Sequence, residues 1–232
     1  MSLLSCENVS LAYGGTYAIK NLSFTLEEGD YLCIVGENGA GKSTLIKGLL
    51  KLKKPVSGSI RTGAGLKANE IGYLPQQNPE QNDFPASVFE IVLSGCLSKL
   101  GFRPFYSKKE KELARSYMRK LNILHLEHAA YSELSGGQKR RVLLARALCS
   151  TSKVILLDEP CTGLDPLVTR ELYQIIKQVN EELGISIIMV SHDIRSALEY
   201  ANKVLHIHGE ETFFGSLEDY KKSPVGKRFL EA

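Results

Sequence analysis

A glycine-rich loop followed by a lysine and a serine is the first group of residues in this sequence that could do chemistry. The stretch GENGAGKST fits the pattern G-x-x-x-x-G-K-[ST]. In this pattern backbone N–H groups hold phosphates, the lysine contacts the β and γ oxygens, and the serine hydroxyl ligates Mg²⁺. The loop therefore predicts a phosphate site. Its predicted nucleotide-binding residues are Gly36, Asn38, Gly39, Gly41, Lys42, Ser43 and Thr44.

Two adjacent carboxylates, Asp158 and Glu159, follow an apolar run in VILLDEP. Adjacent acids at the end of a strand usually mark a solvated edge. With a phosphate loop upstream, Asp158 is instead well placed to orient the shell of a Mg²⁺ ion that Ser43 also ligates. Glu159 is placed to polarise an attacking water as a general base.

A histidine follows another apolar run, in SIIMVSH. Ligands of open α/β sheets bind at the carboxyl ends of parallel strands, so we predict that His192 donates a hydrogen bond to the γ-phosphate. The pairs His125 with His128 and His206 with His208 offer two ligands each, too few for a zinc site. We interpret these four histidines as surface residues.

A second pair of glycines, Gly136 and Gly137, lies at the predicted start of a helix in ELSGGQKRR. Glycine costs up to roughly 1 kcal/mol relative to alanine in a helix. Ser135 and Gln138 fit a capping box, which any helix can use. A cap does not require glycine at both intervening positions, so we interpret the glycines as room for the close approach of another group.

The elements that must position these residues follow from the hydrophobic pattern. Residues 22–26 alternate between apolar and polar, which predicts antiparallel strands within residues 1–30. The runs YLCIV, VILLD and SIIMV lack alternation, as buried parallel strands do, and the spacing from Leu172 to Leu183 predicts a helix between the last two. KVLHIHGEETFFG predicts a hairpin with its turn near Gly209.

Between residues 86 and 129 charged and apolar residues mix with helical spacing, and no buried strand is predicted. We predict one domain over residues 1–232, in the α/β class. It has a P-loop NTPase core, which is a parallel sheet with helices, and an N-terminal antiparallel β subdomain. An α-helical subdomain, approximately residues 86–150, is inserted in the core.

Composition argues against several other classes. The net charge of +3 is too small to indicate a nucleic-acid partner, and the short charged runs KKEK and KRR are interpreted as solvated faces. Five cysteines without C-x-x-C spacing favour a reducing cytosol. The N-terminus shows no signal peptide, and no apolar run approaches the ~20 residues that span a bilayer. We therefore expect any membrane role to depend on a partner.

Together and in their order along the chain, these motifs resemble those of the ATPase subunit of ATP-binding cassette (ABC) transporters. GENGAGKST, YLPQQ, LSGGQKRR, VILLDEP, GLD and SH each occur once. The resemblance implies ATP and Mg²⁺ as ligands, with Tyr13 stacking on adenine and Tyr17 as a weaker candidate. It also implies that Gln76 links Mg²⁺ to a membrane partner and that Asp165 lies in a turn facing a second subunit. The catalytic residues that it implies are Lys42, Gln76, Glu159 and His192.

The resemblance also implies what the second glycine pair is for. In this family the group that approaches such glycines is the γ-phosphate of ATP held by the opposite subunit. Ser135, Gly136, Gly137 and Gln138 would then bind the nucleotide of the partner chain in a homodimer. Two ATP molecules would be sandwiched between the two chains, and hydrolysis would release them.

The segment NDFPASVFEIVLSG resembles the zinc and manganese uptake branch of the family. This implies an importer whose ATPase docks on separate permease subunits at the cytoplasmic face of the cell membrane, served indirectly by a substrate-binding protein. Siderophore and cobalamin importers stay open. Two alternatives from another class also stay open, namely a soluble ATPase for cofactor assembly and an inactive nucleotide-binding module. We place the permease contact near Gln76, Phe84 and Phe89.

Overall fold

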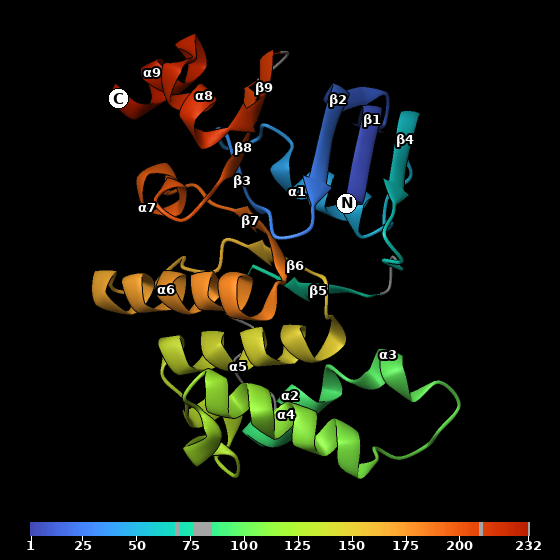
Figure 1. Ribbon diagram of the computed structural model, residues 1–232, viewed down its shortest axis with the longest axis vertical. Coiled ribbons are helices and arrows are strands. Elements are labelled where there is room, and N and C mark those ends of the chain that lie inside the picture. Colours follow the sequence, from blue (N-terminus) through green and yellow to red (C-terminus); the bar gives the residue numbers. More distant parts are fainter. Residues whose placement is uncertain (68–69, 77–84, 209–210, 232) are drawn as a thin grey trace.

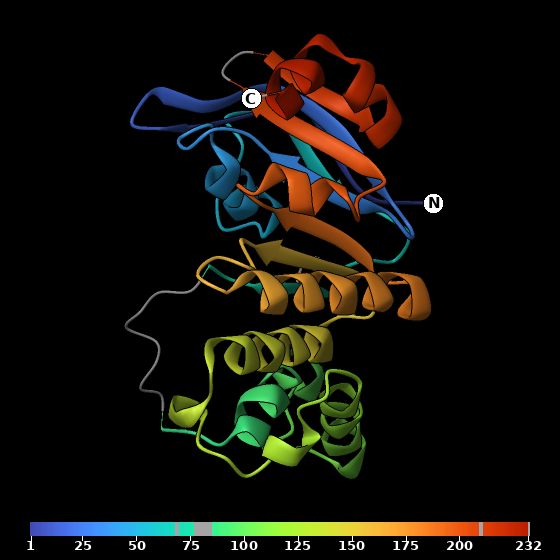
Figure 2. The ribbon, with the colours of Figure 1, turned by 90° about the vertical axis from the view of Figure 1, so that its left-hand side faces the viewer.

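Two β-sheets and a layer of helices make up the chain in the computed structural model, which describes residues 1–67, 70–76, 85–208 and 211–231 (Figure 1). One sheet has six strands in the order β5-β6-β7-β3-β8-β9, and the other has three in the order β2-β1-β4. Figure 2 shows the helical layer on the opposite side of the six-stranded sheet from the three-stranded one.

The three-stranded sheet is antiparallel, as predicted for the N-terminal region. Its strands are β1 (Ser2–Tyr13), β2 (Thr16–Glu27) and β4 (Ser57–Thr62). In β2 the side chains of Leu22, Phe24 and Leu26 are buried while their neighbours are exposed or half-buried, because successive residues of a strand point to opposite faces.

The six-stranded sheet is parallel except for its last strand. Its members are β5 (Ile71–Leu74), β6 (Val154–Asp158), β7 (Ser186–Val190), β3 (Tyr31–Val35), β8 (Lys203–His208) and β9 (Glu211–Ser216). Every residue of β3, β6 and β7 is buried, which explains why these runs do not alternate. The α/β class is therefore confirmed, and the segments that follow these three strands lie at one edge of the sheet.

Helices of five to 18 residues follow the core strands. They are α1 (Lys42–Leu49), α6 (Pro166–Leu183), α7 (Ile194–Leu198), α8 (Leu217–Lys222) and α9 (Pro224–Glu231). The helix predicted between β6 and β7 is α6. It begins at Pro166, where a missing backbone N–H costs nothing because the first turn of a helix has no partner for it.

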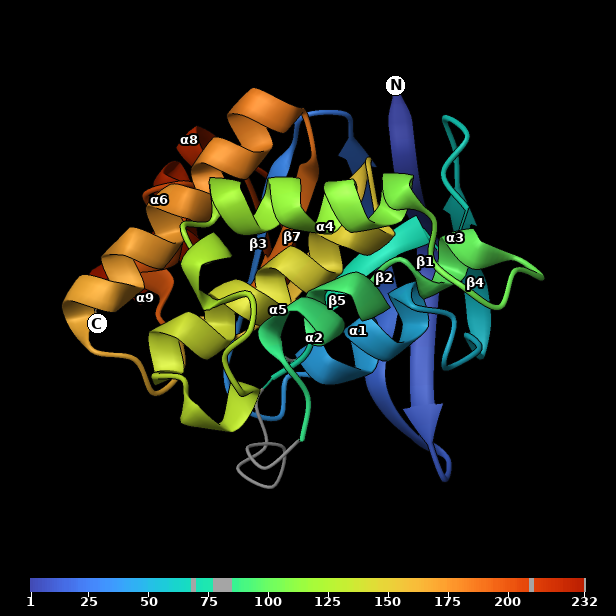
Figure 3. The ribbon, with the colours of Figure 1, turned by 90° about the horizontal axis from the view of Figure 1, so that it is seen from below.

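The helical layer contains α2 (Val88–Ser94), α3 (Leu97–Leu100), α4 (Lys108–Lys120), two 3₁₀ turns (Leu124–Leu126 and Tyr131–Glu133) and α5 (Gly136–Ser150). Figure 3 shows α2, α4 and α5 stacked in front of the parallel sheet. Helix α5 packs on α2 and α4 on one side and on β5 and α6 on the other, so it joins the layer to the core. Within the described ranges, no helix has the length and apolar character to cross a bilayer.

The two short charged runs are not simply solvated faces, and the prediction is wrong for one residue in each. Arg140 in KRR is 1% exposed, and Glu110 in KKEK is 8% exposed, with its carboxylate 2.7 Å from the guanidinium of Arg103. Helical spacing explains Arg140, because positions 144 and 148 of the same face are buried leucines.

The prediction of a surface position is also wrong for His206. Strand β8 lies between β3 and β9, and the C-terminal helices cover one face of it. The Nδ1 atom of His206 lies 2.8 Å from the hydroxyl of Tyr220, and the ring of Phe229 packs edge-on at 4.2 Å between centroids. His125 and His128 are exposed, as predicted.

His206 should make folding sensitive to mild acid. Burial lowers the pKa of His206 to about 4, and the positive charges of His208 and Lys42 act in the same direction. The unfolded chain takes up this proton below about pH 6.5, whereas the folded chain resists until about pH 4, so stability is lost as pH falls through that window. We expect His206→Gln to show a shallower fall in melting temperature between pH 7 and pH 5. The exposed control His125→Gln should follow the wild type, and equal slopes for all three proteins would contradict this expectation.

Candidate functional site

The glycine-rich loop lies between β3 and α1, and two of its glycines are required by the fold. A Cβ atom at Gly36 would overlap the carbonyl oxygen of Ile207, and one at Gly41 would lie 2.5 Å from the carbonyl oxygen of Ala18. Gly39, with a φ of +84°, has open space around it. Helix α1 has no side-chain cap on its first N–H groups, so its N-terminus can receive an anion. The loop therefore fits a phosphate ligand.

The Lys42 side chain folds over this loop. It is 7% exposed, and its amine donates to the carbonyl oxygens of Gly36 at 2.6 Å and Glu37 at 2.9 Å. Burial lowers the pKa of Lys42, while the charges of Glu159 and Asp158 oppose the shift. The amine thus lies within electrostatic reach of both carboxylates at the end of β6.

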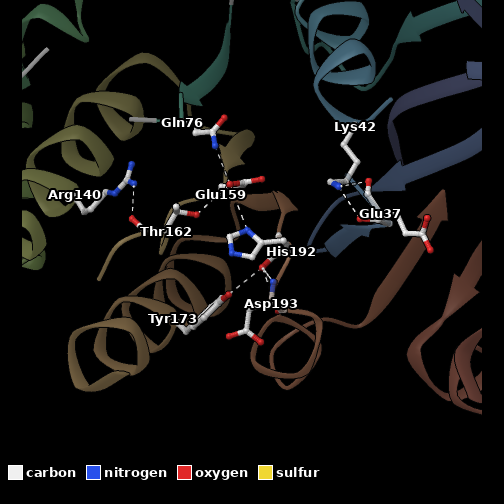
Figure 4. Close-up of polar contacts among 11 residues, drawn as sticks. Glu37, Lys42, Gln76, Arg140, Glu159, Thr162, Tyr173, His192 and Asp193 are labelled. Carbon is white, nitrogen blue, oxygen red and sulfur yellow. Dashed lines mark hydrogen bonds and ion pairs between the residues drawn. The ribbon is translucent and has the colours of Figure 1, made fainter. Parts of the chain in front are cut away.

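Three side chains converge on one oxygen of Glu159, the Oε2 atom (Figure 4). Gln76 donates to it at 2.9 Å, the Thr162 hydroxyl donates at 3.1 Å, and His192 Nδ1 lies 3.4 Å away. These residues follow β5, β6 and β7, which are neighbours in the sheet. The site thus combines the carboxylate with side chains from three loops.

The backbone of Glu159 is itself unusual. Its φ of 48° lies in the left-handed region, which is uncommon for a residue with a side chain. Its N–H donates to the carbonyl oxygen of Val190 at 2.9 Å, which ties the turn to β7. Residues in such conformations cluster at functional sites, where the surrounding structure holds them in place.

Asp158 lies one residue earlier and is 8% exposed. Burial and, after it, the neighbouring charge of Glu159 raise the pKa of Asp158 to about 6, against the opposing effects of Lys42 and of the Tyr73 hydroxyl, which donates to Oδ2 at 3.4 Å. A buried carboxylate beside another acid favours a cation nearby. Ser43 is exposed in the first turn of α1.

The second glycine pair begins α5, as predicted. The N–H of Gln138 donates to the Ser135 hydroxyl at 3.3 Å, and the N–H of Ser135 donates to Gln138 Oε1 at 2.9 Å, which completes a capping box. A Cβ at Gly137 would lie 2.6 Å from Val168 Cγ1 of α6 in the same chain. The room at Gly137 is therefore already used by Val168. Gly136 is exposed, and a Cβ there would come no closer than 3.4 Å to another side chain.

The chain matches the ABC transporter family over residues 19–162, which is more than half of its length. The chain belongs to the ABC transporter family.

Curated relatives cover most of this ABC chain. The manganese transport system ATP-binding protein MntB of Bacillus subtilis is 35% identical over 92% of this chain and 86% of its own length. The zinc uptake system ATP-binding protein ZurA of Listeria innocua is 32% identical over 94% of this chain and 88% of its own length. The zinc import ATP-binding protein ZnuC of Mannheimia succiniciproducens is 36% identical over 96% of this chain and 79% of its own length.

Solved structures agree with the fold. One is an ABC transporter assigned to the metal-chelate type, in an inward-facing conformation, which matches with a TM-score of 0.88 and 29% identity over 100% of this chain and 90% of that one. Another is the dimeric structure of a bacterial ABC transporter cassette, with a TM-score of 0.76 and 27% identity over 93% of this chain and 99% of that one. The P-loop NTPase core of this ABC chain therefore has solved counterparts.

The two tyrosines that the resemblance singled out flank the β1–β2 turn. Tyr13 is 48% exposed and Tyr17 is 49% exposed. The amine of Lys53 lies 3.6 Å from the ring centroid of Tyr13, and that of Lys20 lies 5.7 Å from the ring of Tyr17. The amine of Lys47 lies 5.9 Å from the centroid of the Tyr13 ring.

Two further predicted positions of this ABC chain have clear structural surroundings. Asp165 caps α6, because its Oδ1 accepts from the N–H groups of Leu167 and Val168, both at 3.1 Å. Phe89 is half-buried, with the guanidinium of Arg115 4.8 Å from its ring centroid. Phe84 lies outside the described residues.

Sequence reasoning missed three residues that the structure brings to the site. Thr162 donates to Glu159, Tyr73 donates to Asp158, and Arg140 Nη2 donates to the carbonyl oxygen of Thr162 at 3.2 Å. The sequence carries a signal for Tyr73, which lies in YLPQQ three residues before Gln76. Helical spacing in α5 is the signal for Arg140.

A cavity of about 640 Å³ opens beside this cluster, between α6 and α7. Its lining includes Glu159, His192 and Tyr173 but none of the glycine-rich loop, so it is not the phosphate site itself. It gives the carboxylate of Glu159 a path to solvent.

Gly137→Ala should disturb the contact between α5 and α6. The new Cβ would press on the stiff β-branched side chain of Val168, and overpacking of this kind costs about 1–3 kcal/mol. We expect Gly137→Ala to lower the free energy of unfolding in urea titrations, and the double variant Gly137→Ala/Val168→Ala to recover most of the loss. Gly136→Ala is the matched control and should be close to neutral. Equal effects of the two alanines would contradict this account of the glycines.

Proposed function

We propose that this chain is the ATP-hydrolysing subunit of an importer that takes up a divalent metal ion, zinc or manganese, through a separate permease. The observation that carries the proposal is the convergence of Gln76, Thr162 and His192 on Glu159, at the sheet edge that also carries the phosphate loop. A carboxylate held there can take a proton from water that attacks the γ-phosphate.

The triphosphate of ATP would bind along the glycine-rich loop. The open space at Gly39 and the uncapped N-terminus of α1 suit the phosphates, and Lys42 would exchange its carbonyl contacts for the β and γ oxygens. Asn38, Gly41 and Thr44 line the same turn, and Tyr13 would stack on adenine.

The residues present fit a Mg²⁺ ion. Asp158 is a buried carboxylate that a cation would stabilise in its charged form, and Ser43 has an exposed hydroxyl. The amide nitrogen of Gln76 donates to Glu159, the residue next to Asp158, so its amide oxygen is available as a further ligand. When bound, the ion neutralises charge on the β and γ oxygens.

Each residue around Glu159 would then have one task. The Glu159 carboxylate would accept the proton of the attacking water through Oε1, since Gln76 and Thr162 already donate to Oε2. Thr162 and Gln76 hold that carboxylate in place, since both donate to it. His192 is 54% exposed on its side chain, so it can turn to donate a hydrogen bond to the γ-phosphate.

The chain would act as a homodimer. The exposed Gly136 in the first turn of α5 would offer a second anion site through its backbone N–H. Ser135, Gly136 and Gln138 would bind the γ-phosphate held by the partner chain, and Gly137 would contribute through its backbone. The dimeric structure of a similar cassette supports this arrangement.

The cargo and location rest on the relatives. Manganese and zinc systems recur among them, which favours these metals over siderophores or cobalamin. The chain would bind permease subunits at the cytoplasmic face of the cell membrane, with a substrate-binding protein acting on the other side. The aromatic side chains available for such a contact include Phe102 and Phe105, which are 109% and 80% exposed.

Glu159→Gln tests the proposal. The variant keeps the shape of the side chain but removes the base, so ATP turnover should fall by about 10² to 10⁴. ATP affinity, measured by fluorescence titration, should stay within a few-fold of the wild type, because the phosphate loop is untouched. Cells that depend on the variant should contain less zinc or manganese than cells with the wild type when grown in metal-limited medium.

The surface variant Glu218→Gln is the control, since Glu218 lies in α8 and is 73% exposed on its side chain. It should match the wild type in every assay. Turnover by Glu159→Gln close to that of the control would refute the role of the carboxylate, and a fall in turnover with unchanged cell metal would refute the cargo.

A further inference from the structure

Arg140 is a buried charge to which the proposed function assigns no task. Its side chain is 1% exposed, and its Nε and Nη1 atoms have no hydrogen-bond partner among the described residues. Burial lowers the pKa of Arg140, and the charge of Glu159 is among those that oppose the shift. A guanidinium placed this way disfavours folding unless it is paired, so its presence calls for a role other than stability.

Arg140 is connected through Thr162 to the Glu159 carboxylate. Its Nη2 atom donates to the carbonyl oxygen of Thr162 at 3.2 Å, and the hydroxyl of the same threonine donates to Glu159 Oε2 at 3.1 Å (Figure 4). Arg140 lies one helical turn after Gly136 on α5. Two side chains therefore connect the N-terminal turn of α5 to Glu159.

A neighbouring ion pair makes a different connection. Arg141 Nη2 lies 2.6 Å from Glu171 Oε2 and joins α5 to the middle of α6 at a partly exposed position. It does not reach the turn that carries Thr162. Of these two arginines, Arg140 is the one that donates a hydrogen bond to the turn between β6 and α6 in the part of the chain that the structure describes.

We propose that Arg140 is a positioning residue that sets the orientation of Glu159 through Thr162, so that the position of α5 controls the reactivity of the carboxylate. The inference rests on the proposed function, since it assigns a device to the same hydrolytic site. This role accounts for Nε and Nη1 of Arg140, which have no hydrogen-bond partner among the described residues. Arg140 needs its hydrogen bond to the Thr162 carbonyl oxygen, and partners for the other two nitrogen atoms would hold the guanidinium in a different place. Binding of a ligand at the N-terminus of α5 then changes the geometry around Glu159 within the same chain.

Arg140→Met, Thr162→Val and the double variant test the inference. Each keeps the volume of its side chain, and removing an underpaired buried charge should leave the melting temperature equal or higher. We expect Arg140→Met to lower kcat at least tenfold while KM and the ATP dissociation constant stay within twofold. Thr162→Val should lower kcat in the same way, and the double variant should lose no more than the more impaired single variant, since both act through one contact.

Arg146→Met, at an exposed position of α5, is the control and should match the wild type. A kcat of Arg140→Met equal to that control would overturn the inference. So would losses that multiply in the double variant, or a fall in kcat that comes with a lower melting temperature and weaker ATP binding, which indicates a structural role. Wild type and Glu159→Gln measured beside them separate the two claims. If Glu159→Gln alone loses turnover, the proposed function stands without the inference, and if the wild type does not hydrolyse ATP, both fall.

Discussion

The hydrogen bonds to Glu159 Oε2 are the contacts on which the site depends. They exist because β5, β6 and β7 are adjacent and parallel, so that the segments after them meet at one sheet edge. Since β3 pairs with β7, the phosphate loop reaches the same edge, which brings Lys42 within range of the carboxylates. The left-handed backbone of Glu159 is tolerated because its N–H is tied to Val190.

Helix α5 extends this arrangement to the helical layer. Its first turn is exposed at Gly136 and contacts α6 through Gly137 and Val168, and in its next turn the buried Arg140 donates to the carbonyl oxygen of Thr162. Helix α5 therefore connects the exposed Gly136 with the turn whose Thr162 donates to Glu159. A buried charge with unpaired donors is a poor choice for stability, which is consistent with a site that trades stability for activity.

Much of the fold could be predicted from local pattern. Non-alternating apolar runs predicted β3, β6 and β7, and the order of strand, glycine loop and helix predicted the placement of Lys42. Residues whose surroundings depend on distant packing could not be predicted. The burial of His206 follows from C-terminal helices that cover β8, and the role of Gly137 follows from Val168 on a helix about thirty residues away. The charge of Arg140 led to the prediction of a solvent-exposed side chain. Its helical spacing from Leu144 and Leu148, which are buried, is the stronger signal and agrees with its burial.

The central claim is that Ser135, Gly136 and Gly137 act on the nucleotide that a second chain binds. The most direct measurement compares Glu159→Gln with Glu159→Gln/Ser135→Arg, using fluorescence titration for ATP affinity and light scattering for association. The account predicts unchanged ATP affinity together with loss of the ATP-dependent dimer, while Ser98→Arg at an exposed position of α3 leaves both intact. If Ser135→Arg instead abolishes ATP binding by the single chain, the segment acts on its own nucleotide and the account is wrong.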